Sequence, residues 1–362
     1  MKNNIIYYIT FICIILIACK NDDDTSESTE SFDLKTLLQS EVDAQILPAV
    51  SGFVNATNTM EASVQSYLSQ TTEINLTNVK QQWKAIAIAY EKIYAFNIGE
   101  VRSQFIHFSI YNWPVTPIAI ENNISNNTID ENFIDTVPAS LKSIGALEYL
   151  LFRAPVSETN FEIANSENRK NYIKFSALFL KSQAEKLQNI WLPSGSNYAN
   201  TFVNNTETGI RSSFNIFYNG LYNSIDTGKV TKIGKPAGLE KSDVIDPELT
   251  QAFFSDTSLT LIRTNIESIE QLYFNTNSAL GIDDYLLFIT QSNTLNDLVT
   301  NKIDAVINAI DNISLPLDQA ISAEPELVGA LYKALDELRI LFAVDLRSRL
   351  SLIITSTDND GD

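Results

Sequence analysis

The 362-residue sequence contains one histidine, His107, and two cysteines, Cys13 and Cys19. A single histidine cannot form a His-Glu-x-x-His zinc motif, and no carboxylate stands three or four residues away from it. Its apolar surroundings, Phe105–Ser109, favour a packed or hydrogen-bonded side chain over a metal ligand. Cysteines confined to the first 19 residues exclude a disulfide framework and a thiolate metal site in the body of the chain. No catalytic residues are therefore predicted.

Glycine and proline are also scarce, with 12 and 10 residues respectively. All-β folds need many tight turns, and these two residues supply most of them. Hydrophobic residues make up 44% of the chain, which is enough for packed cores. The composition therefore predicts long helices and an all-α fold.

Positively charged residues are also few. The chain has 25 lysines and arginines against 44 aspartates and glutamates, which gives a net charge of −19. Such a field repels nucleic acid and anionic lipid headgroups. Nucleic acid is therefore excluded as a partner, and solubility alone accounts for the acidic surface.

The first residues have the pattern of a bacterial lipoprotein signal. Lys2 precedes the apolar run Ile5–Ile17, and Leu16-Ile17-Ala18-Cys19 matches a lipobox. We expect cleavage of residues 1–18 and lipid on Cys19, which would anchor the protein to the outer membrane at its periplasmic face or at the cell surface. The alternative is an ordinary secretory signal with a chance cysteine.

Residues 19–31 are rich in Asp, Ser, Thr and Glu and are predicted to form an acidic tether. The acidic run after Cys19 also resembles the export signal that sends lipoproteins to the cell surface in Bacteroidetes.

The body of the chain carries apolar residues at helical spacing. One stripe contains Leu76, Val79, Trp83, Ile86, Tyr90 and Ile93, and another contains Val328, Leu331, Leu335, Leu338 and Phe342. A third begins at Tyr172, Phe175 and Phe179. We interpret all three as core faces. Helix starts are expected at Asp246-Pro247-Glu248 and Glu324-Pro325-Glu326, where an acid precedes a proline.

Loops are expected at residues 122–127, 193–205 and 226–246, which are rich in polar and turn-forming residues. The middle one lies near the centre of the chain. It divides the body into two predicted helical-bundle halves, residues 32–192 and 209–362, joined by a linker at residues 193–208.

The segment Ser143–Phe152 reads Ser-Ile-Gly-Ala-Leu-Glu-Tyr-Leu-Leu-Phe. It resembles the signature of the imelysin family, Gly-x-His-x-x-Glu followed by an aromatic residue and two leucines. In this chain Ser143 stands at the glycine position, Gly145 at the histidine position, and Glu148 at the glutamate position. Further likenesses, in the same order as in the family, are Trp83, Tyr111–Pro114, Lys235–Gly238, and Gln251–Phe254, where Gln251 often corresponds to a glutamate.

The resemblance implies an all-helical, two-bundle envelope protein with this motif near a cleft between the bundles. The expected cleft residues are Glu148, Gly145, Ser143, Trp113 and Gln251, and Glu148 is the candidate ligand for iron or another divalent cation. A glycine in place of histidine is expected to open space for a larger ligand. The alternative for Glu148 is a buried ion pair with Arg102 or Arg153.

Some imelysins are linked to iron uptake and others are described as metallopeptidases. The sequence favours an imelysin-like envelope lipoprotein that is not catalytic and binds a small ligand or an outer-membrane receptor during iron or other metal acquisition. A metallopeptidase is disfavoured because the motif histidine is absent. An adhesion or scaffold module with a degenerate cleft is the third hypothesis.

Overall fold

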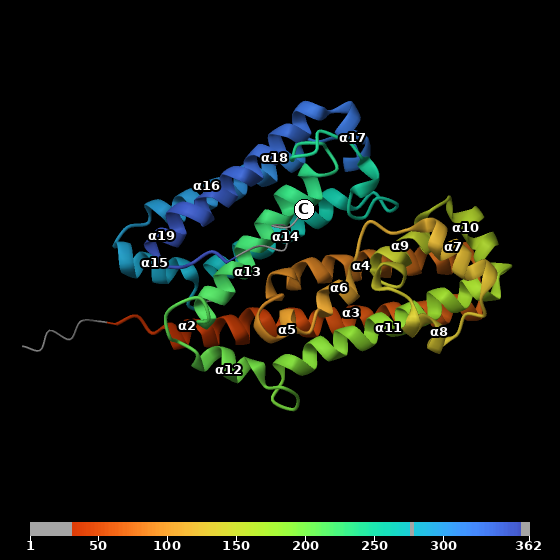
Figure 1. Ribbon diagram of the computed structural model, residues 1–362, viewed down its shortest axis with the longest axis horizontal. Helices are drawn as coiled ribbons and strands as arrows, with labels where there is room; N and C mark the ends of the chain where they lie inside the picture. The colour runs from red at the N-terminus through yellow and green to blue at the C-terminus, as the bar shows by residue number, and fades with distance from the viewer. Residues whose placement is uncertain (1–30, 276–278, 356–362) are drawn as a thin grey trace, which may run out of the picture. The chain divides into compact units, whose positions relative to one another are not determined.

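Every regular element in the two stretches that the computed structural model describes, residues 31–275 and 279–355, is a helix (Figure 1). The all-α prediction is confirmed. Cys19, the predicted signal peptide and all of the tether except Ser31 lie outside the described residues. The longest helices are α3 (Leu47–Ser69), α4 (Glu73–Ile93), α11 (Glu167–Trp191), α13 (Ser213–Thr227), α14 (Ser258–Phe274), α16 (Thr294–Asp311) and α18 (Pro325–Ile340).

Helices α3, α4 and α11 form the centre of the first half, and α3 packs against both of the others (Figure 1). Thr72 and Ser166 cap α4 and α11, because each side-chain oxygen accepts a hydrogen bond from a backbone N–H of the first turn. All six residues of the predicted stripe on α4 are at most 1% exposed. The α4 stripe is therefore the core face that its spacing predicted.

The predicted stripe on α11 is only partly correct. Tyr172 is buried, but Phe175 and Phe179 are half-buried. The ammonium groups of Lys174 and Lys142 lie 5.0 and 4.2 Å from the centroids of these two rings. The residues that share the buried face with Tyr172 are Ile173, Ser176, Ala177, Leu180, Ala184, Leu187, Ile190 and Trp191. Phe175 and Phe179 lie at the margin of that face, where a lysine can reach their rings.

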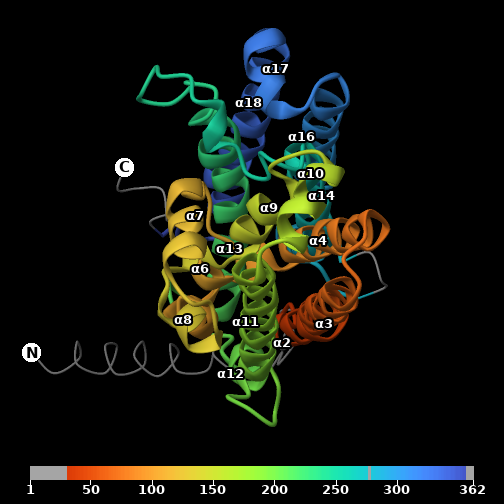
Figure 2. The same ribbon diagram turned by 90° about the vertical axis from the view of Figure 1, so that its right-hand side faces the viewer.

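Short elements complete the first half. They are α2 (Leu34–Glu41), the π-helix η1 (Val42–Ile46), the 3₁₀ helices η2 (Tyr94–Phe96) and η3 (Ala139–Leu141), α5 (Gly99–Ser103), α6 (Ile106–Ile110), α7 (Pro117–Asn126), α8 (Glu131–Thr136), α9 (Ile144–Phe152) and α10 (Val156–Ala164). Figure 2 shows α6, α7 and α8 on the side of α11 that faces away from α3. The prediction of a loop at residues 122–127 is wrong, because α7 continues to Asn126 and buries Ile120 and Ile124.

In the second half, α13 continues into the π-helix η4 (Gly228–Gly234), and α16 packs against α14 and α18. The smaller elements of this half are the 3₁₀ helix η5 (Pro247–Leu249), α15 (Ile282–Thr290), α17 (Leu317–Ala323), the π-helix η6 (Leu341–Leu346) and α19 (Arg347–Arg349). Helix α12 (Tyr198–Asn204) lies in the predicted linker and packs against α2 and α11. The start of α18 at Pro325 and its buried stripe agree with the sequence prediction.

Three other expectations are corrected. The segment 193–205, predicted as a loop, contains α12. Of the predicted loop 226–246, the first nine positions belong to α13 and η4. The predicted helix start at Asp246 yields only the three-residue η5, although Asp246 does accept a hydrogen bond from the N–H of Glu248.

The described residues from Asp33 onward form one compact unit. The predicted linker at residues 193–208 lies between α11 and α13, but the division into two domains stays a prediction. None of the helices in the described part of the chain is both long enough and apolar enough to cross a membrane.

The two halves meet where α14 packs against α4 and where α13 packs against η2. Gly220 makes the second contact possible, because a Cβ atom at this position would lie 2.2 Å from the carbonyl oxygen of Ala95. Any larger residue would push α13 away from the first half.

A buried ion pair joins the halves in the same region. The ammonium group of Lys232 in η4 lies 2.5 Å from Glu91 Oε2 in α4, and Gln251 Nε2 donates a 2.9 Å hydrogen bond to Glu91 Oε1. Each of the three residues is at most 1% exposed. Burial lowers the pKa of the Lys232 ammonium group, and the charge of Glu91 opposes this shift. Each charge therefore depends on the other, because burial removes the water that would otherwise stabilise it.

We predict that Lys232→Met lowers the free energy of unfolding by about 3–5 kcal/mol, because it leaves the Glu91 carboxylate buried without a counter-charge. Adding Glu91→Leu should recover much of this loss, since the unpaired charge is then removed. Urea unfolding followed by circular dichroism measures both values.

The matched control is Lys302→Met. Lys302 forms a 2.7 Å ion pair with Glu337, and these side chains are 29% and 41% exposed, so water reaches both. Exposed pairs contribute about 0–1 kcal/mol, so this variant should be near wild type. Equal effects of Lys232→Met and Lys302→Met would contradict the structural role of the buried pair.

Candidate functional site

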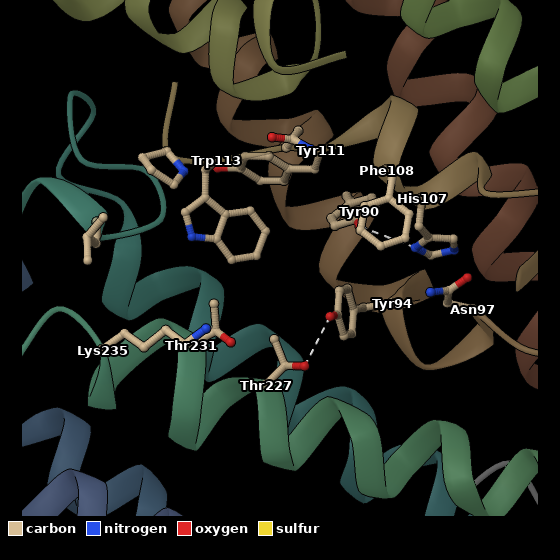
Figure 3. A pocket seen from close by; sticks show the side chains of 13 residues that line it. Tyr90, Tyr94, Asn97, His107, Phe108, Tyr111, Trp113, Thr227, Thr231 and Lys235 are labelled. Atoms are coloured by element: carbon tan, nitrogen blue, oxygen red, sulfur yellow. Dashed lines mark hydrogen bonds between the residues drawn. The ribbon is translucent and has the colours of Figure 1, made fainter. Parts of the chain in front are cut away.

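Two pockets lie in the cleft between the halves. The first, with a volume of about 420 Å³, is called the tyrosine pocket here. Its lining comes from both halves: Tyr90, Tyr94, Asn97, His107, Phe108, Tyr111, Asn112, Trp113 and Pro114 from the first, and Thr227, Thr231, Lys235 and Leu249 from the second. Figure 3 shows the aromatic side chains of the first half facing Thr227, Thr231 and Lys235 across the cavity. Tyr94 and Thr227 bridge it with a 3.1 Å hydrogen bond between their hydroxyl groups.

The single histidine is part of the tyrosine pocket. His107 is 4% exposed, its Nδ1 lies 3.2 Å from the Tyr90 hydroxyl, and its ring packs against Tyr90 and Tyr94. Burial lowers the pKa of His107 to about 3, so the ring is neutral at physiological pH. Its Nε2 and the Tyr111 hydroxyl are buried without a hydrogen-bond partner among the described residues. Both atoms are therefore buried polar groups with unmet hydrogen-bonding capacity next to the pocket.

The second pocket has a volume of about 300 Å³ and is called the Glu148 pocket. It is lined by Trp113, Pro114, Val115, Pro117, Glu148, Asp246, Glu248, Leu249, Thr250, Ala252, Phe253 and Phe254. Trp113, Pro114 and Leu249 also line the tyrosine pocket. The two pockets are therefore neighbours that share a wall, and Trp113 belongs to that wall.

Glu148 lies on α9 and is 3% exposed. Its Oε1 accepts a 2.8 Å hydrogen bond from the backbone N–H of Ser255. Burial raises the pKa of Glu148 to about 7, the hydrogen bonds from Ser255 and Phe254 oppose the shift, and the charge of Asp256 adds to it. The carboxyl group is therefore close to half ionised at neutral pH.

The alternative ion pair of Glu148 with Arg102 or Arg153 is not found. Arg153 pairs with Glu162, and no ion pair among the described residues includes Glu148. The buried carboxylate thus faces a cavity without a positive partner from the described part of the chain.

Ser143 and Gly145 lie behind the cleft and line neither pocket. Ser143 Oγ donates to the carbonyl oxygen of Asn112 at 3.1 Å and accepts from its N–H at 3.2 Å. A Cβ atom at Gly145 would lie 2.6 Å from that same carbonyl oxygen and 3.0 Å from Val115 Cγ1. The expectation that Gly145 opens space is wrong, because the Asn112 backbone and the Val115 side chain fill the space beside its Cα atom.

Gln251 is 1% exposed and lines neither pocket. Its side chain lies in the core behind the pockets, where Nε2 donates a hydrogen bond to Glu91. The Tyr111 hydroxyl approaches Gln251 without the geometry of a hydrogen bond, and Gln251 Oε1 has no partner among the described residues. Of the five expected cleft residues, Glu148 and Trp113 line a pocket and the other three lie in the layer behind it.

Several residues of this region were not predicted. Glu91 follows Tyr90 in the core stripe of α4, and its position one residue beyond a buried tyrosine was the only signal for it. Lys232 gave no signal, since a lysine in a polar segment is usually exposed. Asp246 and Glu248 were interpreted only as a helix start, yet both line the Glu148 pocket.

The motif residues do not fit a protein-bound metal ion. Position 145 has no side chain, and Glu148 already accepts a backbone hydrogen bond. Among the described residues no group of three or more His, Cys, Asp or Glu side chains is placed to hold a metal ion. Stable zinc or iron sites in proteins need several such ligands together.

We predict that Gly145→Ala destabilises the protein by about 1–3 kcal/mol, because the new methyl group must displace the Asn112 backbone. Gly329→Ala in α18 is the matched control, since a Cβ atom there has no neighbour within 4 Å. It should be neutral or stabilising by up to about 1 kcal/mol. Thermal and urea unfolding test this; equal behaviour of the two variants would contradict the close packing of the Trp113 segment.

We also predict a pH-dependent effect of Glu148→Gln. The folded-state pKa of about 7 exceeds the ordinary value of 4.5, so the folded protein binds this proton more tightly than the unfolded chain. The resulting stability is fully present below pH 4.5 and is lost as the pH rises through 7. Between pH 5 and pH 8, the free energy of unfolding of the wild type should fall by about 2–3 kcal/mol relative to that of the variant, as measured by urea unfolding. A constant difference would contradict the raised pKa.

Comparisons with known proteins give one family match and two similar folds. The family model described as Imelysin matches residues 46–342. The fold is similar to that of a protein from Parabacteroides distasonis named as an iron-regulated protein A precursor, with a TM-score of 0.73, 20% identity, and coverage of 90% of this chain and 97% of that one. It is also similar to an imelysin-like protein from Psychrobacter arcticum, with a TM-score of 0.74, 15% identity, and coverage of 89% and 96%. No curated protein matches the sequence.

At these identities the two structures establish only that the fold is shared. The family model matches more than half of the chain, and the matched stretch includes the α9 motif, the Trp113 segment and Gln251. This chain belongs to the imelysin family.

Proposed function

We propose that the protein is a non-catalytic, lipid-anchored binding protein of the cell envelope that takes up a small ligand in the cleft between its halves, as an accessory in iron or other metal acquisition. The observation that carries this proposal is the pair of adjoining pockets around Trp113, in which no set of metal-ligating side chains converges among the described residues. Such a cleft suits a metal chelate better than a bare ion.

The size and lining of the cleft support a ligand of this kind. Pockets of about 300–1,000 Å³ bind organic molecules when a mostly apolar lining carries a few fixed polar groups. The two pockets have volumes of about 420 and 300 Å³. Aromatic rings line both, and Asn97, Asn112 and Thr227 are among the polar residues that line the larger one.

The link to metal acquisition rests on similarity. One structural neighbour is named as an iron-regulated protein. A chelate brings its own metal ligands, so a protein that binds it does not need the motif histidine. The polar groups of the cleft would then recognise the organic part of the chelate.

We propose a non-catalytic role because the cleft has few side chains that could bind a metal ion or act as a base. His107 is the only histidine, its pKa of about 3 makes it a weak base at neutral pH, and it is held by Tyr90. Peptide hydrolysis by a bound metal requires several protein ligands and a base, which these residues do not provide.

Anchoring is proposed from the sequence alone. Cys19 lies outside the described residues, and its lipobox supports attachment to the outer membrane. The acidic tether would hold the cleft away from the membrane, where an outer-membrane receptor could exchange ligand with it.

We predict that equilibrium dialysis of the protein lacking residues 1–19, with elemental analysis, finds about one metal per protein for at least one chelate. The probes are ferric citrate, ferric catecholate and ferric hydroxamate complexes and haem, each compared with free iron, zinc, manganese and calcium ions. Free ions should be retained far less, because no multidentate site is present among the described residues. Trp113→Ala should weaken chelate binding by about tenfold or more.

Phe161→Ala is the control, because Phe161 is 68% exposed on α10 and lines neither pocket. Stoichiometric free metal that disappears in Glu148→Gln would overturn the chelate model in favour of direct metal binding. Chelator-sensitive cleavage of an unfolded substrate would indicate a peptidase instead. Failure of every probe would favour a scaffold role.

A further inference from the structure

The Glu148 pocket carries charge of one sign. Glu148, Asp246 and Glu248 all line it, and no Lys, Arg or His is among its lining residues. The charge of Asp256 also acts on Glu148 and on Asp318. The pocket is therefore a concave surface of negative potential, and such surfaces concentrate positively charged ligands.

Glu148 distinguishes this pocket from an ordinary acidic surface. Its side chain is 3% exposed, and the hydrogen-bond donors that act on it among the described residues are those of Ser255 and Phe254. Buried carboxylates normally have a positive partner, because burial removes the water that would otherwise stabilise the charge. No such partner is present among the described residues, so a ligand in the pocket is in a position to supply it.

Two further features point to the same kind of ligand. Trp113, Phe253 and Phe254 contribute aromatic rings to the lining, and aromatic faces attract organic cations. Thr250 is 2% exposed, also lines the pocket, and its hydroxyl has no hydrogen-bond partner among the described residues. An N–H donor in the pocket would satisfy this oxygen.

A metal cation fits this lining less well than an organic one. The carboxylates do not converge on one point as metal ligands, and calcium or magnesium needs about six oxygen atoms around it. An ammonium group has only three donors, and its adjoining carbon atoms can pack against the aromatic rings.

We propose that the Glu148 pocket binds the protonated amine of an organic ligand, with Glu148 as the buried counter-charge, Glu248 and Asp246 at the rim, and the rings of Trp113, Phe253 and Phe254 around the adjoining carbon atoms. This inference rests on the proposed function, since the amine is one part of the molecule bound in the cleft. The remainder of that molecule extends past Trp113 into the tyrosine pocket.

The test uses two small probes of nearly equal shape, 2-phenylethylammonium and the neutral 2-phenylethanol. Their affinities are measured by isothermal titration calorimetry at pH 8, above the Glu148 pKa of about 7. The ammonium probe should bind about tenfold or more tightly than the alcohol, since only the ammonium gains the ion pair. Glu148→Gln should remove about tenfold of the ammonium affinity and leave that of the alcohol unchanged.

Glu248→Gln is the second variant, because Glu248 is exposed and its replacement does not disturb the core. It should weaken ammonium binding by about two- to threefold, as expected of a rim charge. Glu326→Gln removes an equal charge from α18, outside both pockets, and should change neither affinity.

Equal affinity of the two probes, or an unchanged ammonium affinity in both Glu148→Gln and Glu248→Gln, would overturn the inference. The outcome is separable from that of the proposed function. Chelate retention that depends on Trp113, together with equal probe affinities, would sink only the amine site. Ammonium selectivity without retention of any chelate would sink only the metal-acquisition role.

Discussion

The buried ion pair of Lys232 and Glu91 is the contact on which the cleft depends. It joins η4 of the second half to α4 of the first, and Gln251 extends it to the segment that follows η5. Tyr90, the residue before Glu91, and Tyr94, three residues after it, line the tyrosine pocket. Thr231, the residue before Lys232, lines it as well. Thr231 and Lys232 are consecutive residues of η4, and their side chains point to different sides of the helix, Thr231 to the cavity and Lys232 to the core. The geometry of the pocket and the cohesion of the halves therefore share the same few residues.

The Trp113 segment gives the cleft its second constraint. In the family motif a histidine side chain would project from α9; here Gly145 lets the Asn112 backbone approach, and Ser143 holds it with two hydrogen bonds. The segment thereby brings Trp113 between the two pockets. The absence of a side chain at position 145 and the placement of Trp113 between the pockets therefore depend on the same packing contact.

The sequence predicts the helices of this fold well where apolar residues repeat over several turns, as on α4 and α18. It predicts Glu148 and Trp113 through their order along a family pattern. It fails at Gly145, because the atoms that fill the space beside a glycine come from Asn112, more than 30 residues earlier. It also fails at Lys232, since periodicity ranks a lysine as exposed and only the position of Glu91 explains its burial. Asp246 shows a third limit of prediction from sequence. Its position before a proline indicates only a helix start, whereas the same residue also lines a pocket.

The unpaired carboxylate of Glu148 connects stability with binding. With a pKa of about 7 against an ordinary 4.5, ionised Glu148 makes the folded protein less stable by about 3 kcal/mol at pH values above 7. A cationic ligand that pairs with it recovers part of that free energy as affinity, because the desolvation of the carboxylate has already occurred during folding. A surface carboxylate would have to lose its water at the moment of binding. The buried position of Glu148 thus lowers the stability of the ligand-free fold but favours the binding of a cation. The Lys232–Glu91 pair differs, because each of its charges already has its partner within the chain.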